Sequence, residues 1–180
     1  GDVYKRQVSV KYIYNQLKKY ESEVDQNDST YWLYFELIWR DFFKYVSMQH
    51  KEKFFSRDGI YGDEKQWSTD QKTLSNWING KTSEPFVNAN MIELFETGFM
   101  SNRGRQNVSN YLTKELKIDW RIGAEYFESM LIDYDVHSNY GNWLYNAGIG
   151  NDSMPFRKFN PKLQSERYDP DKLYEKTWLN

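Results

Sequence analysis

Apolar residues recur every three or four positions along most of the chain, which places them on one face of an α-helix. No stretch of useful length alternates apolar and polar residues with the period of two that a half-buried strand requires. The interval 50–70 is irregular, and beyond residue 151 we expect a mostly extended chain that ends in one short helix. The predicted class is all-α with an irregular C-terminal tail, and the predicted helices are 8–24, 31–47, 69–79, 85–97, 102–116, 119–132, 137–146 and 171–178.

Residues typical of helix ends support several of these boundaries. The run 27–30, Asn-Asp-Ser-Thr, consists of residues that cap helix N-termini through side-chain oxygens. Pro85 is suited to the first turn of a helix, and Gly80 and Gly98 are suited to the C-terminal stop. Within the second predicted helix, Glu36 and Arg40 are four residues apart, so we expect them to pair on its surface.

The composition narrows the classes of function. Phe, Trp and Tyr make up 18 % of the 180 residues, which excludes a disordered chain and supports one domain with a sizeable core. Twenty-four Lys and Arg residues against 26 Asp and Glu residues leave no net basicity, so a nucleic-acid partner would need a local patch. There is no Cys, and His50 and His137 are far apart in sequence, so we expect no metal site.

Two segments bear on the origin of the chain. Residues 1–7 match the translation of an adapter used in sequencing libraries, so we leave them out of the fold and take 8–180 as the domain. We expect the natural protein to begin upstream. No apolar run reaches membrane-spanning length and no secretory signal is present, so we expect no membrane partner and an intracellular location: cytoplasmic in a bacterium, organellar or nuclear in a eukaryote.

Charged residues stand at two positions that call for partners. Arg103 and Arg105 fall in the first turn of a predicted helix, where the helix dipole disfavours cations. Asp133 and Asp135 share one turn between two predicted helices and are candidate partners. One interpretation is a structural ion pair or an ordinary helix cap; the other is a pair that lines a cofactor pocket.

The tryptophans also allow two interpretations. Trp67, Trp77, Trp120 and Trp143 lie on four different segments, and core filling explains each of them individually. Trp39 is different, because it shares a helix with Glu36 and Arg40. An indole beside a carboxylate and a guanidinium can be a platform on which a nucleobase stacks. The amide and phenol groups that could assist it belong to Asn102, Gln106 and Tyr145.

Several motifs, in a fixed order, resemble the DNA photolyase and cryptochrome family. With x for a position outside the pattern, they are ELIWRDFF at 36–43, WxxGxTxxPxVxAxMxxL at 77–94, TGxMxNRxR at 97–105, DWRxGA at 119–124, DxD at 133–135 followed by Asn139 and by GNW at 141–143, and FNP at 159–161. The similarity extends from about residue 8 to 178. The runs at 98–108 and 148–152 are similar to the cryptochrome-DASH branch in particular.

The resemblance implies an all-helical domain that binds FAD in a folded conformation. It implies that Asp133 and Asp135 contact the flavin or its ribityl chain, that Arg105 pairs with Asp133, and that Asn139 lies near flavin N5. Trp143, Trp120 and Trp67 match the family's electron relay, whereas Trp77 does not belong to it. An antenna pigment, expected to be a folate, would belong to an N-terminal α/β domain that these residues do not include.

The resemblance also implies a substrate. Glu36 and Trp39 match the acid and the stacking indole that meet a flipped pyrimidine dimer, with Asn139 completing the catalytic set. The DNA-binding set is Glu36, Trp39, Arg40, Asn102, Arg103, Gln106, Tyr145 and Gln164. Gln106 and Tyr145 stand where enzymes that repair duplexes usually have Met and Trp, which is typical of the branch that prefers single strands.

The resulting hypothesis is a monomeric, light-driven, FAD-dependent lyase of cyclobutane pyrimidine dimers that prefers single-stranded DNA. The alternative is a flavin photoreceptor or nucleic-acid-binding regulator without repair activity. Because the family's phosphate-binding loop would precede residue 8, we expect this chain alone to bind FAD weakly or not at all and to be inactive.

Overall fold

The computed structural model describes residues 9–179. Within that range it contains helices and no strand; one isolated parallel bridge joins Ser68 to Ile118. The helices, in chain order, are α2 (Val10–Glu23), α3 (Asp28–His50), the 3₁₀ turn η1 (Lys51–Phe55), α4 (Gln71–Ile78), α5 (Pro85–Thr97), α6 (Asn102–Asn110), the π-helical turn η2 (Tyr111–Glu115), α7 (Trp120–Met130), α8 (Val136–Ala147), α9 (Pro161–Tyr168) and α10 (Leu173–Leu179). The predicted all-α class is confirmed.

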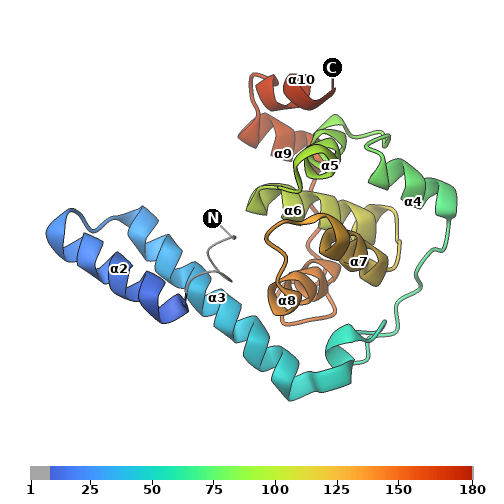
Figure 1. The fold of residues 1–180 in the computed structure, drawn as a ribbon. Helices are drawn as coiled ribbons and strands as arrows, with labels where there is room; N and C mark the ends of the chain where they lie inside the picture. Colours follow the sequence, from blue (N-terminus) through green and yellow to red (C-terminus); the bar gives the residue numbers. More distant parts are fainter. Residues whose placement is uncertain (1–8, 180) are drawn as a thin grey trace.

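Helices α2 and α3 form an antiparallel pair beside the main body, and the C-terminal half of α3 packs on α8 (Figure 1). Asn27 begins α3 through a capping box: its side chain accepts from the backbone of Thr30, and the Thr30 hydroxyl accepts from the Asn27 backbone. The expected pairing of Glu36 with Arg40 is wrong. Arg40 instead lies 3.5 Å from the adjacent Asp41, and Glu36 is exposed.

The core lies where α6, α7 and α8 meet, and the fully buried indoles of Trp77, Trp120 and Trp143 fill it. Helices α7 and α8 approach closely at Gly123, where an added Cβ would come within 2.2 Å of the Trp143 ring. Glycine is therefore required here by space, because any side chain would displace the indole.

The predicted helix 102–116 is α-helical only as far as Asn110 and then widens into η2. The backbone N–H of Leu116 bonds to the Tyr111 carbonyl, a five-residue step. One wider turn directs Lys114 to the C-terminus of α8, where its ammonium group donates to the carbonyls of Ala147 and Pro155. A single such turn hardly alters the apolar spacing, so the sequence pattern did not reveal it.

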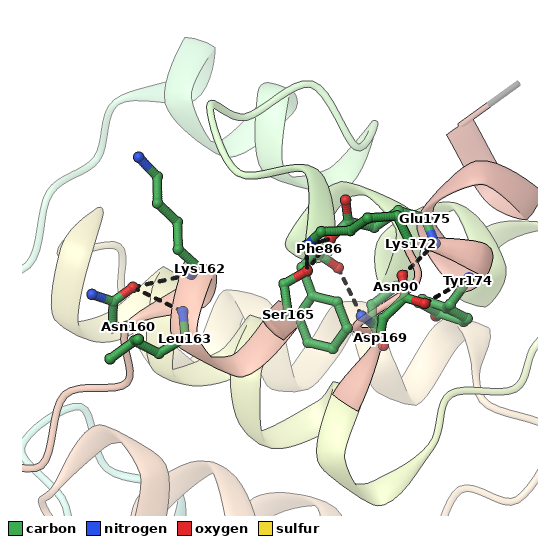
Figure 2. A network of polar contacts seen from close by, with 10 residues as sticks. All are labelled: Phe86, Asn90, Asn160, Lys162, Leu163, Ser165, Asp169, Lys172, Tyr174 and Glu175. Atoms are coloured by element: carbon green, nitrogen blue, oxygen red, sulfur yellow. Dashed lines mark hydrogen bonds and ion pairs between the residues drawn. The ribbon is translucent and has the colours of Figure 1, made fainter. Parts of the chain in front are cut away.

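The prediction of extended chain after residue 151 is wrong for 161–168, which form α9. The start signal was present: the Asn160 side chain caps the helix by accepting from Lys162 and Leu163, and Pro161 occupies the first turn (Figure 2). The apolar period was absent, because Ser165 is the helix's buried residue. Tertiary contacts therefore hold α9 in place.

A polar network joins α9 and α10 to α5 (Figure 2). The carboxylate of Asp169 accepts from the backbone of Tyr174 and Glu175, and the buried hydroxyl of Ser165 lies between Lys172 and Glu175. The Tyr174 hydroxyl donates to Glu93 of α5 at 2.6 Å, and burial together with that carboxylate raises the pKa of Tyr174. The end of the chain is thereby tied to the helix that leads into α6. In the part of the chain that the structure describes, no helix is both long and apolar enough to cross a membrane.

Candidate functional site

The start of α6 and the turn before α8 are joined by Arg105 and Asp133. The Arg105 guanidinium donates to both carboxylate oxygens, at 3.1 and 2.9 Å, and also to the Met100 carbonyl. The Asp133 side chain is 2 % exposed and that of Arg105 is 22 % exposed. The predicted pair is therefore present, and it neutralises a carboxylate that could not remain charged in the interior by itself.

Asp135, two residues later, is the N-cap of α8. Its side chain accepts from the backbone of Ser138 at 3.0 Å. Burial would raise the pKa of this carboxyl, but the hydrogen bond from the Ser138 backbone and the nearby charge of Arg40 outweigh it, and the pKa is lowered. The two acids of the turn thus differ: Asp133 is an ion-pair partner, whereas Asp135 is a cap that stays ionised.

Two polar atoms beside Asp135 are buried without a hydrogen-bond partner in residues 9–179. They are Nε of Arg40 and the hydroxyl of Ser138. Asn139, one turn into α8, is buried and donates its amide N–H to the Ala124 carbonyl of α7 at 2.9 Å. This bond fixes the orientation of the side chain and leaves its oxygen available as an acceptor.

The indoles of Trp143, Trp120 and Trp67 occur at separate places in the core. Trp143 makes edge contacts with Phe127 at 5.1 Å and with Trp77 at 6.3 Å between ring centroids. Trp120 donates to the Arg57 carbonyl. Trp67 is 8 % exposed, and its indole N–H is buried without a partner among the described residues. In that same set of residues, no ring contact joins one member of the predicted relay to another.

The proposed stacking residue Trp39 meets Tyr145 across the interface of α3 and α8. Their ring centroids are 6.2 Å apart in an edge-to-face arrangement, and Phe43 supports Trp39 from the same helix at 5.4 Å. Two residues predicted to face the lesion are therefore brought together from positions more than a hundred residues apart.

The N-terminal turn of α6 presents the other predicted DNA contacts. Asn102 and Arg103 are exposed, and Arg103 donates to the Gln106 amide oxygen at 2.8 Å. The Arg103 guanidinium also lies over the ring of Tyr168, 4.8 Å from its centroid. Gln164 of α9 accepts from Asn107 at 3.3 Å, which places it beside the same helix.

A polar recess of about 250 Å³ opens next to Tyr145. It contains Arg103, Gln106 and Tyr145, the motif residue Phe159, and residues that sequence reasoning missed: Asn110, Asn146, Asp152 and Arg157. Asn110 is 3 % exposed and bonds the backbone at both Arg157 and Phe159, at 3.1 and 2.9 Å. Asp152 faces Arg157 at 3.9 Å. The FNP motif marked this segment, but only the fold shows that Asn110 holds it.

Comparison with known proteins identifies the family to which this arrangement of residues belongs. The profile of the "FAD binding domain of DNA photolyase" matches residues 32–180. The chain belongs to this photolyase and cryptochrome family. Its relatives include proteins named Cryptochrome DASH from Danio rerio, 54 % identical over 96 % of this chain and 33 % of the relative, and from Synechocystis, 55 % identical over 96 % and 35 %.

Solved structures of the photolyase and cryptochrome family agree with the fold. The Synechocystis sp. PCC6803 cryptochrome superposes with a TM-score of 0.93 over 96 % of this chain and 36 % of that one, at 55 % identity. A bacterial class III photolyase from Agrobacterium tumefaciens has a TM-score of 0.84, covering 93 % and 35 %, at 34 % identity. The chain spans about a third of the length of the curated relatives that it matches.

The donor set fits the FAD that the photolyase and cryptochrome family implies. A flavin ring presents polar atoms along one edge, and its ribityl chain carries hydroxyls; both need donors and acceptors. The partnerless Nε of Arg40 and the hydroxyl of Ser138 are such groups, as is the free oxygen of Asn139. Asp135 supplies a carboxylate beside them. When bound, the flavin supplies the electron chemistry; these side chains would bind and orient it.

Proposed function

We propose that the protein of which this chain forms part repairs cyclobutane pyrimidine dimers with light and FAD, and prefers dimers in single strands. The observation that carries this proposal is the contact of Trp39 with Tyr145 at 6.2 Å beside a polar recess. An aromatic corner next to amide and guanidinium groups suits a pair of bases turned out of a strand, because rings stack while base edges accept and donate hydrogen bonds.

The remaining assignments belong to the same proposal. Glu36 and Trp39 would contact the dimer, Asn139 would lie at the reactive edge of the flavin, and Arg105, Asp133 and Asp135 would hold the cofactor. Asn102, Arg103, Gln106, Tyr145 and Gln164 would contact DNA, as would the outer end of the Arg40 guanidinium, whose buried Nε faces the cofactor side. Trp143, Trp120 and Trp67 would return electrons to photoexcited oxidised flavin, and a folate would serve as antenna.

Two side chains in the recess support the preference for single strands. Gln106 and Tyr145 make it more polar than Met and Trp would, so an extruded dimer gains less from apolar contact there. Extruding bases from a duplex costs a few kcal/mol, whereas unpaired bases require much less. A polar pocket therefore lowers duplex binding more than single-strand binding.

The test uses the full-length protein with reduced flavin, a single-stranded oligonucleotide carrying one dimer, and blue light. Repair should occur, and Trp39→Ala should weaken binding of the dimer by about 1–3 kcal/mol, the range for one stacked base. Trp32→Ala is the matched control, because Trp32 is an exposed indole on the same helix. Normal photoreduction of the flavin without any repair would contradict the proposal.

That negative outcome would favour a second function, a flavin photoreceptor without repair activity. The observation in its favour is that the similar proteins from Danio rerio and Synechocystis bear the name cryptochrome. The two functions share the flavin site and differ in whether Trp39 and the recess bind a pyrimidine dimer, so the repair assay separates them.

A further inference from the structure

Trp120 has an aromatic neighbour in α8 that the motifs did not single out. The ring of Tyr140 lies edge-on to Trp120, with the centroids 5.9 Å apart. On its other side Tyr140 meets Phe55 at 4.9 Å. Trp120 is fully buried, whereas Tyr140 is half-buried, so Tyr140 lies between the core and the surface.

A proton acceptor is already hydrogen-bonded to the Tyr140 hydroxyl. It donates to the exposed carboxylate of Glu128 in α7 at 3.2 Å. Burial and the Glu128 charge raise the pKa of Tyr140 to about 12, so the phenol keeps its proton at neutral pH. Loss of an electron makes a phenol strongly acidic, and a carboxylate already hydrogen-bonded to it can take the proton without rearrangement.

Trp67, the outer residue of the proposed relay, has no such hydrogen-bonded proton acceptor in the part of the chain that the structure describes. Its indole N–H is buried and has no acceptor among residues 9–179, and it makes no described ring contact with Trp120. An oxidised indole at that position would keep its proton and would remain able to take the electron back. Tyr140 contacts Trp120 directly and can release its proton, which makes the transfer harder to reverse.

We propose that Tyr140 is a terminal electron donor to oxidised Trp120 and that Glu128 accepts its proton. The inference rests on the electron relay of the proposed function, whose oxidant is photoexcited oxidised flavin. One electron passes from Tyr140 to the Trp120 radical cation, which becomes neutral. The phenolic proton passes to Glu128, leaving a neutral tyrosyl radical and a protonated carboxyl group. Charge and electrons balance without a further reactant.

The direct test is electron paramagnetic resonance of the illuminated full-length flavoprotein. A tyrosyl radical should form in the parent and be lost in Tyr140→Phe, which keeps the ring contacts with Trp120 and Phe55. Tyr126→Phe is the matched control: Tyr126 lies near Trp77, its hydroxyl is buried without a partner among the described residues, and the tyrosyl signal should persist. A parent spectrum with only tryptophanyl radicals would overturn the inference, as would a tyrosyl signal that survives in Tyr140→Phe.

Two readouts test Glu128 as the acceptor. In Glu128→Gln the tyrosyl radical should form more slowly and at a rate that rises with pH, because solvent base must then take the proton. In the flavin-free 180-residue chain, ultraviolet titration of the phenol, taken as the difference from Tyr140→Phe, should show a lower Tyr140 pKa in Glu128→Gln. An unchanged rate and an unchanged titration would remove Glu128 from the step.

Trp143→Phe distinguishes a failure of this inference from a failure of the proposed function on which it rests. If flavin photoreduction continues in Trp143→Phe, the relay itself is wrong. If photoreduction stops in Trp143→Phe while Tyr140→Phe leaves the radical spectrum unchanged, the relay stands and the assignment of Tyr140 is wrong.

Discussion

The guanidinium of Arg105 donates two hydrogen bonds to the buried carboxylate of Asp133, which joins the first turn of α6 to the turn that precedes α8. The placement that looked unfavourable in the sequence, a cation at a helix start, is thus balanced by an acid 28 residues away. Because the Asp133 side chain is 2 % exposed, the pair should matter for folding as well as for any cofactor.

We expect Asp133→Asn to lower the free energy of unfolding by about 3 kcal/mol, since it removes the buried carboxylate that accepts two hydrogen bonds from the Arg105 guanidinium. Denaturation by urea measures the change. Asp41→Asn is the control: it removes the exposed partner of Arg40 and should alter stability by less than about 1 kcal/mol. Equal effects of the two substitutions would show that the Arg105 pair is no more than a surface contact.

Trp143→Phe should abolish photoreduction of oxidised FAD in the full-length protein while leaving FAD bound, because phenylalanine fills the space but is far harder to oxidise than indole. Transient absorption follows the reduction. Trp77→Phe is the matched control, since Trp77 is equally buried and touches Trp143 but lies outside the proposed relay. Photoreduction that persists in the first variant, or is lost in the second, would change the order of the relay.

Lys114 should make stability depend on pH. Burial, followed by the charges of Lys65 and Lys117, lowers its pKa from 10.5 to about 8. The folded state therefore disfavours the ammonium form, fully below pH 8 and progressively less as pH rises to 10.5. Relative to Lys114→Met, the parent should gain stability between these values. Unfolding free energies at several pH values measure the difference; a constant difference would show that partial burial does not lower the pKa of Lys114.

Asn110→Leu should weaken binding of single-stranded DNA, because it releases the backbone at Arg157 and Phe159 and lets the recess beside Tyr145 open. If Arg157 contacts a phosphate, the slope of log affinity against log salt should fall by about 0.7, the value for one phosphate on a single strand. Fluorescence anisotropy at several salt concentrations measures both. Thr113→Val, which removes a buried hydroxyl bonded to the carbonyls of Ser109 and Asn110 one turn earlier, should leave the slope unchanged.

The sequence alone determined where most helices lie and which charged residues call for a partner. Apolar periodicity located the helices from α2 to α8 to within a few residues, because a helix that buries one face must repeat that face every turn. Capping by Asn27 and the stop at Gly98 are local effects, since side chain and backbone lie only a few residues apart. The order of the motifs was also sufficient to indicate the family.

The tertiary structure decided which groups meet. It made Asp133 an ion-pair partner and Asp135 a cap, although both acids stand in the same turn. It formed α9 without an apolar period, set Asn110 against Arg157, and brought Tyr140 to Trp120 and Glu128. Such contacts depend on how helices cross and on how far each side chain reaches, and that information is spread over the whole packed core rather than held in any one stretch of sequence.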